Sequence, residues 1–201
     1  MRLEKKIYSL NALDLAPKLL GMILCRKIDG NIIKVRIAET EAYFGKFDTA
    51  CHASKGKTDR NKIMYEAGGF TYIYLCYGMH NMLNIVSGKK NSPEAVLIQG
   101  CEFISSPANF KFFQNKSNLV LKDQSIEKNF KIKINQKLNG PGKLTKSLNI
   151  DRSLNGENLI TSDKLWIEDD NYKCDYSLAK RVGIDYATDE YKNKLWRFIM
   201  K

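Results

Sequence analysis

The sequence predicts an α+β fold in one domain, residues 1–201, with a mainly antiparallel, curved and barrel-like sheet surrounded by helices. Two observations predict it. Segments rich in β-branched and aromatic residues dominate the first half of the chain, and helical patterns appear around them. Hydrophobic residues make up 43% of the 201 residues, which is enough to form a packed core.

The elements follow in order. An apolar pattern at 15–20, with Pro17 near its start and Gly21 past its end, predicts a helix. Asp29-Gly30 predicts a hairpin joining strands at 22–28 and 32–41. A polar loop at 51–61 and a Gly68-Gly69 break follow. Further strands are expected at 70–77, 81–86, 95–101 and 159–168.

Residues 105–137 differ from the rest in charge. The stretch is rich in lysine and contains only two acidic residues, Asp123 and Glu127. We interpret the stretch as a basic insertion or a helical cover, with regular structure returning at Gly140. The lysines are Lys111, Lys116, Lys122, Lys128, Lys131, Lys133 and Lys137.

The formal net charge of +11 indicates a polyanionic partner, with nucleic acid the default. The alternative is a Lys-rich protein without such a partner. We expect no secretory signal, no membrane span and a reducing, cytoplasmic location. Five widely spaced cysteines without a Cys-x-x-Cys pair favour neither a disulfide framework nor a zinc ribbon. Neither a metal site nor a cofactor is expected.

The strand at 35–43 ends in acidic residues. Val35, Ile37, Glu39, Glu41 and Tyr43 share one face if alternation is regular, so an apolar stripe would end in two carboxylates and an aromatic ring. A buried carboxylate with a raised pKa is suited to act as a general base. The alternative is a strand that emerges into solvent with surface glutamates.

A second feature is the tyrosine-rich strand that follows Gly69. Tyr72 and Tyr74 share one face, whereas Tyr77 precedes Gly78 and should project from a hairpin tip with Met79. An apolar wedge at such a tip could enter a stack of DNA bases. The alternative is that these tyrosines are ordinary sheet aromatics.

His52 adjoins Cys51 in a polar loop. A Cys–His nucleophile is disfavoured, because adjacent residues rarely point the same way, and a surface histidine is the ordinary alternative.

An ordered set of motifs along nearly the whole chain resembles the alkyladenine (3-methyladenine) DNA glycosylase family. The set comprises Glu39-Thr-Glu-Ala-Tyr43, Gly45, Asp48, Ala50, His52, Thr58-Asp-Arg60-Asn61, Tyr72-Ile-Tyr74, Tyr77-Gly-Met79, Asn84, Val96-Leu-Ile98, Glu102, Gly140-Pro-Gly-Lys143-Leu144 and Arg181-Val-Gly-Ile184. The resemblance implies a monofunctional hydrolase that flips alkylated or deaminated purines out of duplex DNA, as a monomer and without a cofactor.

The resemblance also implies a role for each matching residue. Glu41 would activate the attacking water. The walls and floor of a base pocket would be Tyr43, His52, Tyr74 and Asn84. Tyr77 would intercalate with Met79 beside it, and Arg60, Lys143 and Gln99 would lie toward the DNA backbone.

This sequence departs from the family pattern at two positions. Gln99 and Phe103 stand where the family usually has Arg and Pro, and Gln99 lacks the charge and bidentate fork of Arg. The Lys-rich stretch at 105–137 also matches the family poorly and is treated as family-variable.

Three alternatives remain open. The chain could be a non-catalytic binder of damaged or distorted DNA, or a hydrolase of free nucleosides. It could also use an amine, with Lys143 the candidate, in a lyase step, although Glu41 and water are sufficient.

Overall fold

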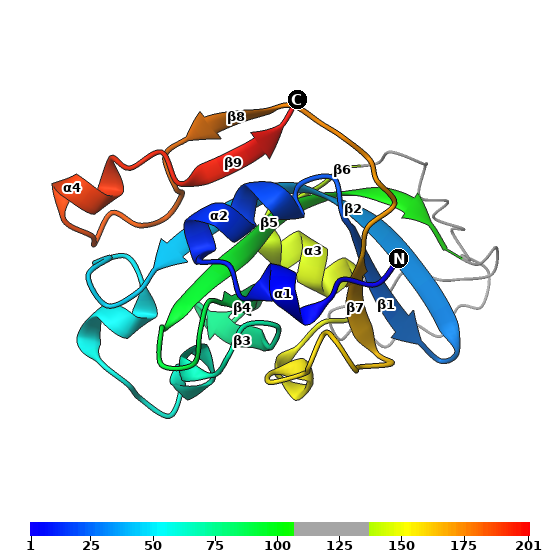
Figure 1. Cartoon of the computed structure of the whole chain (residues 1–201), viewed down its shortest axis with the longest axis horizontal. Coiled ribbons are helices and arrows are strands. Elements are labelled where there is room, and N and C mark those ends of the chain that lie inside the picture. Colours follow the sequence, from blue (N-terminus) through cyan, green and yellow to red (C-terminus); the bar gives the residue numbers. More distant parts are fainter. Residues whose placement is uncertain (107–136) are drawn as a thin grey trace, which may run out of the picture.

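The computed structural model describes residues 1–106 and 137–201, and its sheet is a curled, antiparallel half-barrel (Figure 1). The main path of the sheet is β3-β4-β5-β2-β1-β7, with β6 paired to β5 and β9 paired to β2 and β8. The strands are β1 (Ile23–Ile28), β2 (Asn31–Phe44), β3 (Thr71–Cys76), β4 (His80–Ser87), β5 (Glu94–Ser105), β6 (Lys137–Asn139), β7 (Leu165–Glu168), β8 (Tyr176–Ala179) and β9 (Arg197–Met200). The predicted fold class is confirmed.

Short helices surround this sheet. The α-helices are α1 (Lys5–Tyr8), α2 (Ala12–Leu19), α3 (Pro141–Ser147) and α4 (Asp189–Lys192), and the 3₁₀ helices are η1 (His52–Lys55), η2 (Lys62–Tyr65) and η3 (Arg152–Leu154). None of the helices in the described ranges is both long and apolar enough to cross a membrane.

The hairpin predicted at Asp29-Gly30 is present between β1 and β2. Both residues have positive φ, 48° and 78°, as a type I′ turn requires. The predicted first helix starts earlier than expected, at Ala12, because the Asn11 side chain accepts a hydrogen bond from Asp14 N and caps it. Pro17 therefore lies inside α2 and not at its start.

The main core fills one face of the sheet. Leu15 and Leu19 of α2, Leu144 of α3 and Leu148 directly after α3 belong to the same buried cluster as the inward residues of β1, β2, β4 and β5. A second, smaller cluster lies on the opposite side of β3, β4 and β5 and includes Tyr72. The large core stabilises the sheet, while the small cluster lines the candidate site.

The strand predicted at 159–168 is wrong over its first half, because only Leu165–Glu168 forms β7. Side chains compete with strand pairing there: Asn158 Oδ1 accepts from Ile160 N, and Ser162 Oγ accepts from Lys164 N and Leu165 N. The predicted insertion at 105–137 lies outside the described residues, apart from its ends in β5 and β6.

Candidate active site

A β-bulge determines where Glu41 points. The register between β2 and β5 shifts between Ile37 and Glu39 and again between Glu39 and Thr40. Val35 and Ile37 belong to the main core before the bulge, whereas Ala42 belongs to it after the bulge. The predicted stripe that carries Val35, Ile37 and Glu41 on one face is therefore wrong, because the bulge reverses the alternation.

The reversal brings Glu41 onto the same face as the tyrosines of β3. Across the sheet, Tyr72 pairs with Asn84, Asn84 with Leu97, and Leu97 with Glu41. Tyr43 lies two residues further along β2 and pairs with Ala95. Directly paired residues face the same side of a sheet, so these four strands assemble one polar and aromatic surface.

The Glu41 carboxylate is fully buried and hydrogen-bonded. Its Oε1 accepts from Gln99 Nε2 at 3.0 Å and from Val182 N at 2.8 Å, and its Oε2 accepts from the Tyr43 hydroxyl at 2.9 Å. All three donors are uncharged. Burial raises the pKa of Glu41 above its ordinary value, although the hydrogen bonds from Gln99, Val182 and Tyr43 oppose that rise.

In the part of the chain that the structure describes, the two arginines that act electrostatically on Glu41 are each paired with another carboxylate. Arg181 and Asp48 form a fully buried bidentate ion pair, with nitrogen–oxygen distances of 2.6 and 2.8 Å. Arg197 binds Glu39 at 2.5 Å. Arg181 also donates to Ala42 O at 2.9 Å and lies 4.8 Å from the Tyr43 ring centroid. It thus fixes the segment that presents Val182 N to Glu41.

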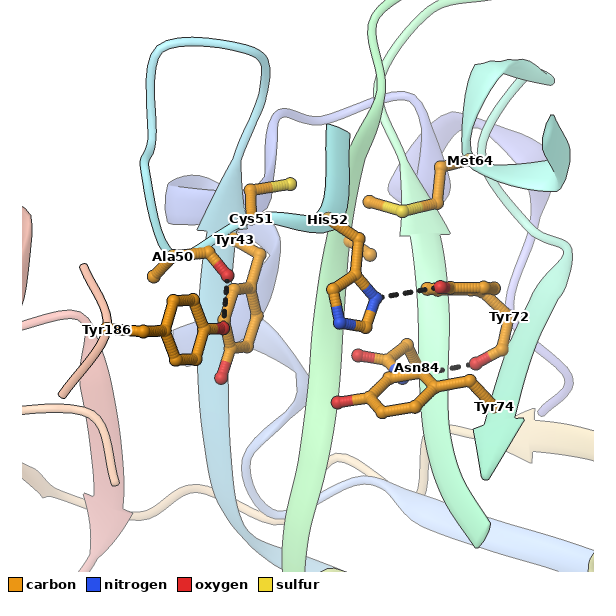
Figure 2. Close-up of a pocket in the computed structure, with 10 residues that line it drawn as sticks. Tyr43, Ala50, Cys51, His52, Met64, Tyr72, Tyr74, Asn84 and Tyr186 are labelled. Atoms are coloured by element: carbon orange, nitrogen blue, oxygen red, sulfur yellow. Dashed lines mark hydrogen bonds between the residues drawn. The ribbon is translucent and has the colours of Figure 1, made fainter. Parts of the chain in front are cut away.

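A pocket of about 270 Å³, including its part open to solvent, is lined by Tyr43, the hydrogen-bond partner of this carboxylate, whereas Glu41 itself does not line it. Figure 2 shows Tyr43, Ala50 and Tyr186 on one side, Tyr72 and Tyr74 on the other, and His52 and Asn84 between them. The ring of Tyr43 lines the pocket while its hydroxyl reaches Glu41, so one residue connects the pocket to the buried carboxylate. The remaining lining residues are Cys51, Met64 and Ala95.

His52 is an uncharged wall of this pocket. Its Nδ1 shares a hydrogen bond of 2.8 Å with the Tyr72 hydroxyl, and its ring meets Tyr74 edge-on at 4.5 Å. Burial, with a contribution from Arg60, lowers the pKa of His52 to about 4, so the imidazole is neutral at pH 7. Burial raises the pKa of the neighbouring Cys51 thiol to about 12, which is unsuited to a thiolate nucleophile.

Asn84 lies at the bottom of the pocket and has a fixed orientation. Its amide nitrogen donates to two backbone carbonyls, Tyr72 O at 3.1 Å and Met82 O at 3.2 Å. Both amide hydrogens are thereby used, and the side-chain carbonyl oxygen is the group left to meet a ligand.

The tip of the β3–β4 hairpin projects into solvent, as the sequence predicts. Tyr77 and Gly78 both have positive φ, 49° and 68°, and Met79 N closes the turn on Cys76 O at 3.1 Å. Tyr77 is 85% exposed and Met79 72% exposed. A non-glycine residue in this region of φ is uncommon, and here it turns the Tyr77 ring outward.

The residues expected near a DNA backbone occupy three different settings. Arg60 is exposed and lies 4.9 Å from the Tyr74 ring centroid, at the pocket rim. Lys143 is exposed on α3, next to Gly142, where an added Cβ would lie 2.9 Å from the His80 ring beside the hairpin tip. Gln99 does not lie on the surface as expected, because its amide is buried against Glu41.

Sequence reasoning assigned no role to Arg181, Val182 or Tyr186. Tyr186 lines the pocket and donates its hydroxyl to Ala50 O at 2.9 Å. All three lie more than 130 residues from their partners in β2 and the loop after it, so local patterns carry no signal for them. The only sequence signal was the family resemblance of the Arg181-Val-Gly-Ile184 motif, which covers Arg181 and Val182 but not Tyr186.

The fold and site define a class: a curled antiparallel half-barrel with a buried carboxylate beside an aromatic pocket and a protruding aromatic hairpin. Residues 6–201 match the family model described as Methylpurine-DNA glycosylase (MPG). The chain belongs to this family.

Relatives along almost the full chain carry the name "Putative 3-methyladenine DNA glycosylase". A protein of Psychrobacter cryohalolentis is 45% identical over 190 residues, which are 92% of this chain and 84% of that protein. One of Natranaerobius thermophilus is 39% identical, covering 100% of this chain and 96% of its own length. One of Borrelia garinii subsp. bavariensis is 41% identical, with 99% and 96% covered.

Proposed function

We propose that this protein is a monofunctional 3-methyladenine DNA glycosylase, which flips alkylated or deaminated purines out of duplex DNA and hydrolyses the N-glycosidic bond. Such a reaction starts base excision repair. The observation that carries the proposal is Glu41, a fully buried carboxylate with three uncharged donors, connected through Tyr43 to an aromatic pocket.

Glu41 suits the chemistry of this bond. Rupture of an N-glycosidic bond develops positive charge at the sugar C1′ and its ring oxygen. A carboxylate shielded from bulk water, whose neighbouring arginines among the described residues are paired with other carboxylates, interacts strongly with such a charge. Its raised pKa also makes it a better acceptor for a proton from the attacking water.

The proposed step balances without a further reagent. The water oxygen bonds to C1′, one water proton moves to Glu41, and the electron pair of the C1′–N bond leaves with the purine. An N-alkylated purine carries a positive charge and leaves as a neutral base, so it needs no acid. A neutral lesion such as hypoxanthine would require protonation of the leaving base.

The pocket fits a flat, cationic base. A cation over Tyr43 or Tyr74 gains about 0.5–2 kcal/mol per favourable ring contact. The neutral His52 adds no repulsion to such a ligand at pH 7. The Asn84 amide hydrogens are used by the backbone, so the side chain would exclude the exocyclic amino group of guanine by lack of space alone and not by repulsion between donors.

The exposed tip would hold the duplex open. Tyr77 would fill the space that the extruded nucleotide leaves, with Met79 beside it, because an apolar ring can stack between neighbouring bases. Arg60 and Lys143 would add sequence-independent affinity for phosphates, together with the net charge of +11. We propose that one such domain, residues 1–201, acts as a monomer on DNA.

The test is base release from a panel of duplexes, each with one 3-methyladenine, 7-methylguanine, hypoxanthine or ethenoadenine, alongside the free modified nucleosides. The proposal predicts release from at least the cationic lesions in duplex DNA and little from nucleosides. Hydrolysis of nucleosides alone would contradict it, and binding of damaged duplex without any release would favour a non-catalytic binder.

A further inference from the structure

The most exposed large apolar side chains of the described surface include residues at the pocket and at the hairpin tip. Apart from the terminal Met1, the four most exposed large ones are Tyr77 at 85%, Phe47 at 73%, Met79 at 72% and Tyr186 at 67%. Tyr186 lines the pocket, and Tyr77 and Met79 form the hairpin tip. Phe47 belongs to none of the motifs considered above and has no assigned role.

Phe47 lies on a loop that the buried side chains hold in place. The next residue, Asp48, accepts hydrogen bonds from Phe44 N and Ala50 N at 3.1 Å each and binds Arg181. Ala50 packs in a small cluster with Ile184 and Ala187. The Phe47 ring therefore extends into solvent from a rigid support, which reduces the entropy lost when it binds a ligand.

This loop connects Tyr43 and Ala50, which line the pocket wall opposite the β3 residues Tyr72 and Tyr74. Figure 2 shows Ala50 and Tyr43 facing Tyr72 and Tyr74 across the pocket. The chain leads from Tyr43 and Ala50 to Phe47 on one side, and from Tyr74 to Tyr77 on the other. Lys46 is exposed and holds its ammonium 5.1 Å from the Phe47 ring centroid, so a cation accompanies the ring.

We infer that Phe47 and Lys46 form a second contact with duplex DNA, across the pocket from Tyr77 and Met79. The ring packs on a sugar or an unstacked base of the damaged strand, and the Lys46 ammonium binds a neighbouring phosphate. The inference rests on the proposed function for the identity of the ligand. Two contacts flanking the pocket would hold the strand on both sides of the extruded nucleotide.

The experiment measures the Kd for a duplex with one 3-methyladenine, a cationic lesion, and the single-turnover rate of base release at saturating protein. Phe47→Ala should weaken binding about 5- to 100-fold, the range of one lost aromatic–base stack, with the single-turnover rate nearly unchanged. Phe47→Tyr should retain wild-type binding. Lys46→Ala should lower the salt dependence of binding by about one phosphate contact.

Ile32→Ala is the matched control. Ile32 is an exposed apolar residue at the far end of β2, about 30 Å of strand from Glu41 by the rise per residue, and its loss should change nothing. Unchanged DNA binding by Phe47→Ala would overturn the inference. So would a wild-type dimer that Phe47→Ala converts to monomer without changing DNA affinity, since Phe47 would then contact a second copy.

Different results would overturn the proposed function and the inference about Phe47. Base release by the wild-type protein with normal DNA binding by Phe47→Ala overturns only the inference. Phe47-dependent binding of damaged duplex by a wild-type protein that releases no base overturns only the proposed function.

Discussion

The buried pair of Asp48 and Arg181 provides the sharpest test of how the site is held together. We predict that Asp48→Asn destabilises the protein by about 3–5 kcal/mol, because it leaves the Arg181 guanidinium buried without a compensating charge. An exposed pair contributes only about 0–1 kcal/mol. Lys62 and Asp59 form such a pair, so Asp59→Asn is the matched control.

The expected change is large relative to total stability. The free energy of unfolding of a single domain is about 5–15 kcal/mol. A loss of 3–5 kcal/mol would therefore lower Tm by about 6–20 °C in a chain of this length. Urea denaturation at pH 7, followed by circular dichroism, measures the free energy of unfolding for each variant. Asp59→Asn should remain within about 0.5 kcal/mol of wild type.

A double variant tests whether the unpaired charge, and not the changed side-chain shape, causes the loss of stability. Asp48→Asn with Arg181→Met removes both charges, so it should recover part of the stability that Asp48→Asn loses. The reasoning would be refuted if Asp48→Asn unfolds within 1 kcal/mol of wild type. It would also be refuted if the effects of the two single substitutions simply add in the double variant.

Three further predictions follow from the site. Burial raises the pKa of Glu41 in the free protein, and the base must be ionised, so kcat/KM for base release from a cationic lesion should fall as pH drops through a midpoint above 4.5. Gln99→Arg should move that midpoint down, and a kcat/KM midpoint at or below 4.5 in the wild-type protein would contradict this. Borohydride should trap no covalent protein–DNA adduct, since water and not Lys143 attacks; a trapped adduct refutes a monofunctional enzyme. The folded state favours neutral His52, because burial lowers its pKa to about 4, so its contribution to stability is present above pH 6.5 and lost toward pH 4. His52→Gln should therefore lose more stability relative to wild type at pH 7 than at pH 4.5. Equal losses at the two pH values in urea denaturation would contradict the assignment.

Local signals predicted the parts of the fold that depend on local chemistry. Asp29-Gly30 forms a turn with two positive φ values, which this dipeptide favours. Tyr77 also has positive φ, against the preference of a bulky residue, so only Gly78 signalled the second turn. The alternation of Tyr72 and Tyr74 placed both on one face, and their rings lie 5.4 Å apart. The exposure of Tyr77 and Met79 followed from the same reasoning.

Long-range features were not predictable in this way. The bulge near Glu39 has no sequence signature of its own, yet it decides that Glu41 faces the pocket side while Ala42 faces the main core. Val182 N reaches Glu41 across 141 positions, and only the folded sheet brings them together. The Gln99 side chain looked like a surface contact, but the pairing of β5 with β2 turns it inward.

Glu41→Gln with a damaged duplex tests the central claim most directly. The amide oxygen can keep the bonds from Gln99 and Val182, and the amide NH₂ can donate to the Tyr43 hydroxyl, so the shape of the site stays while its charge is removed. The account predicts a Kd for the lesion duplex within a few-fold of wild type, a Tm no lower, and single-turnover base release slower by about 10²- to 10⁴-fold. Base release within tenfold of wild type would contradict it.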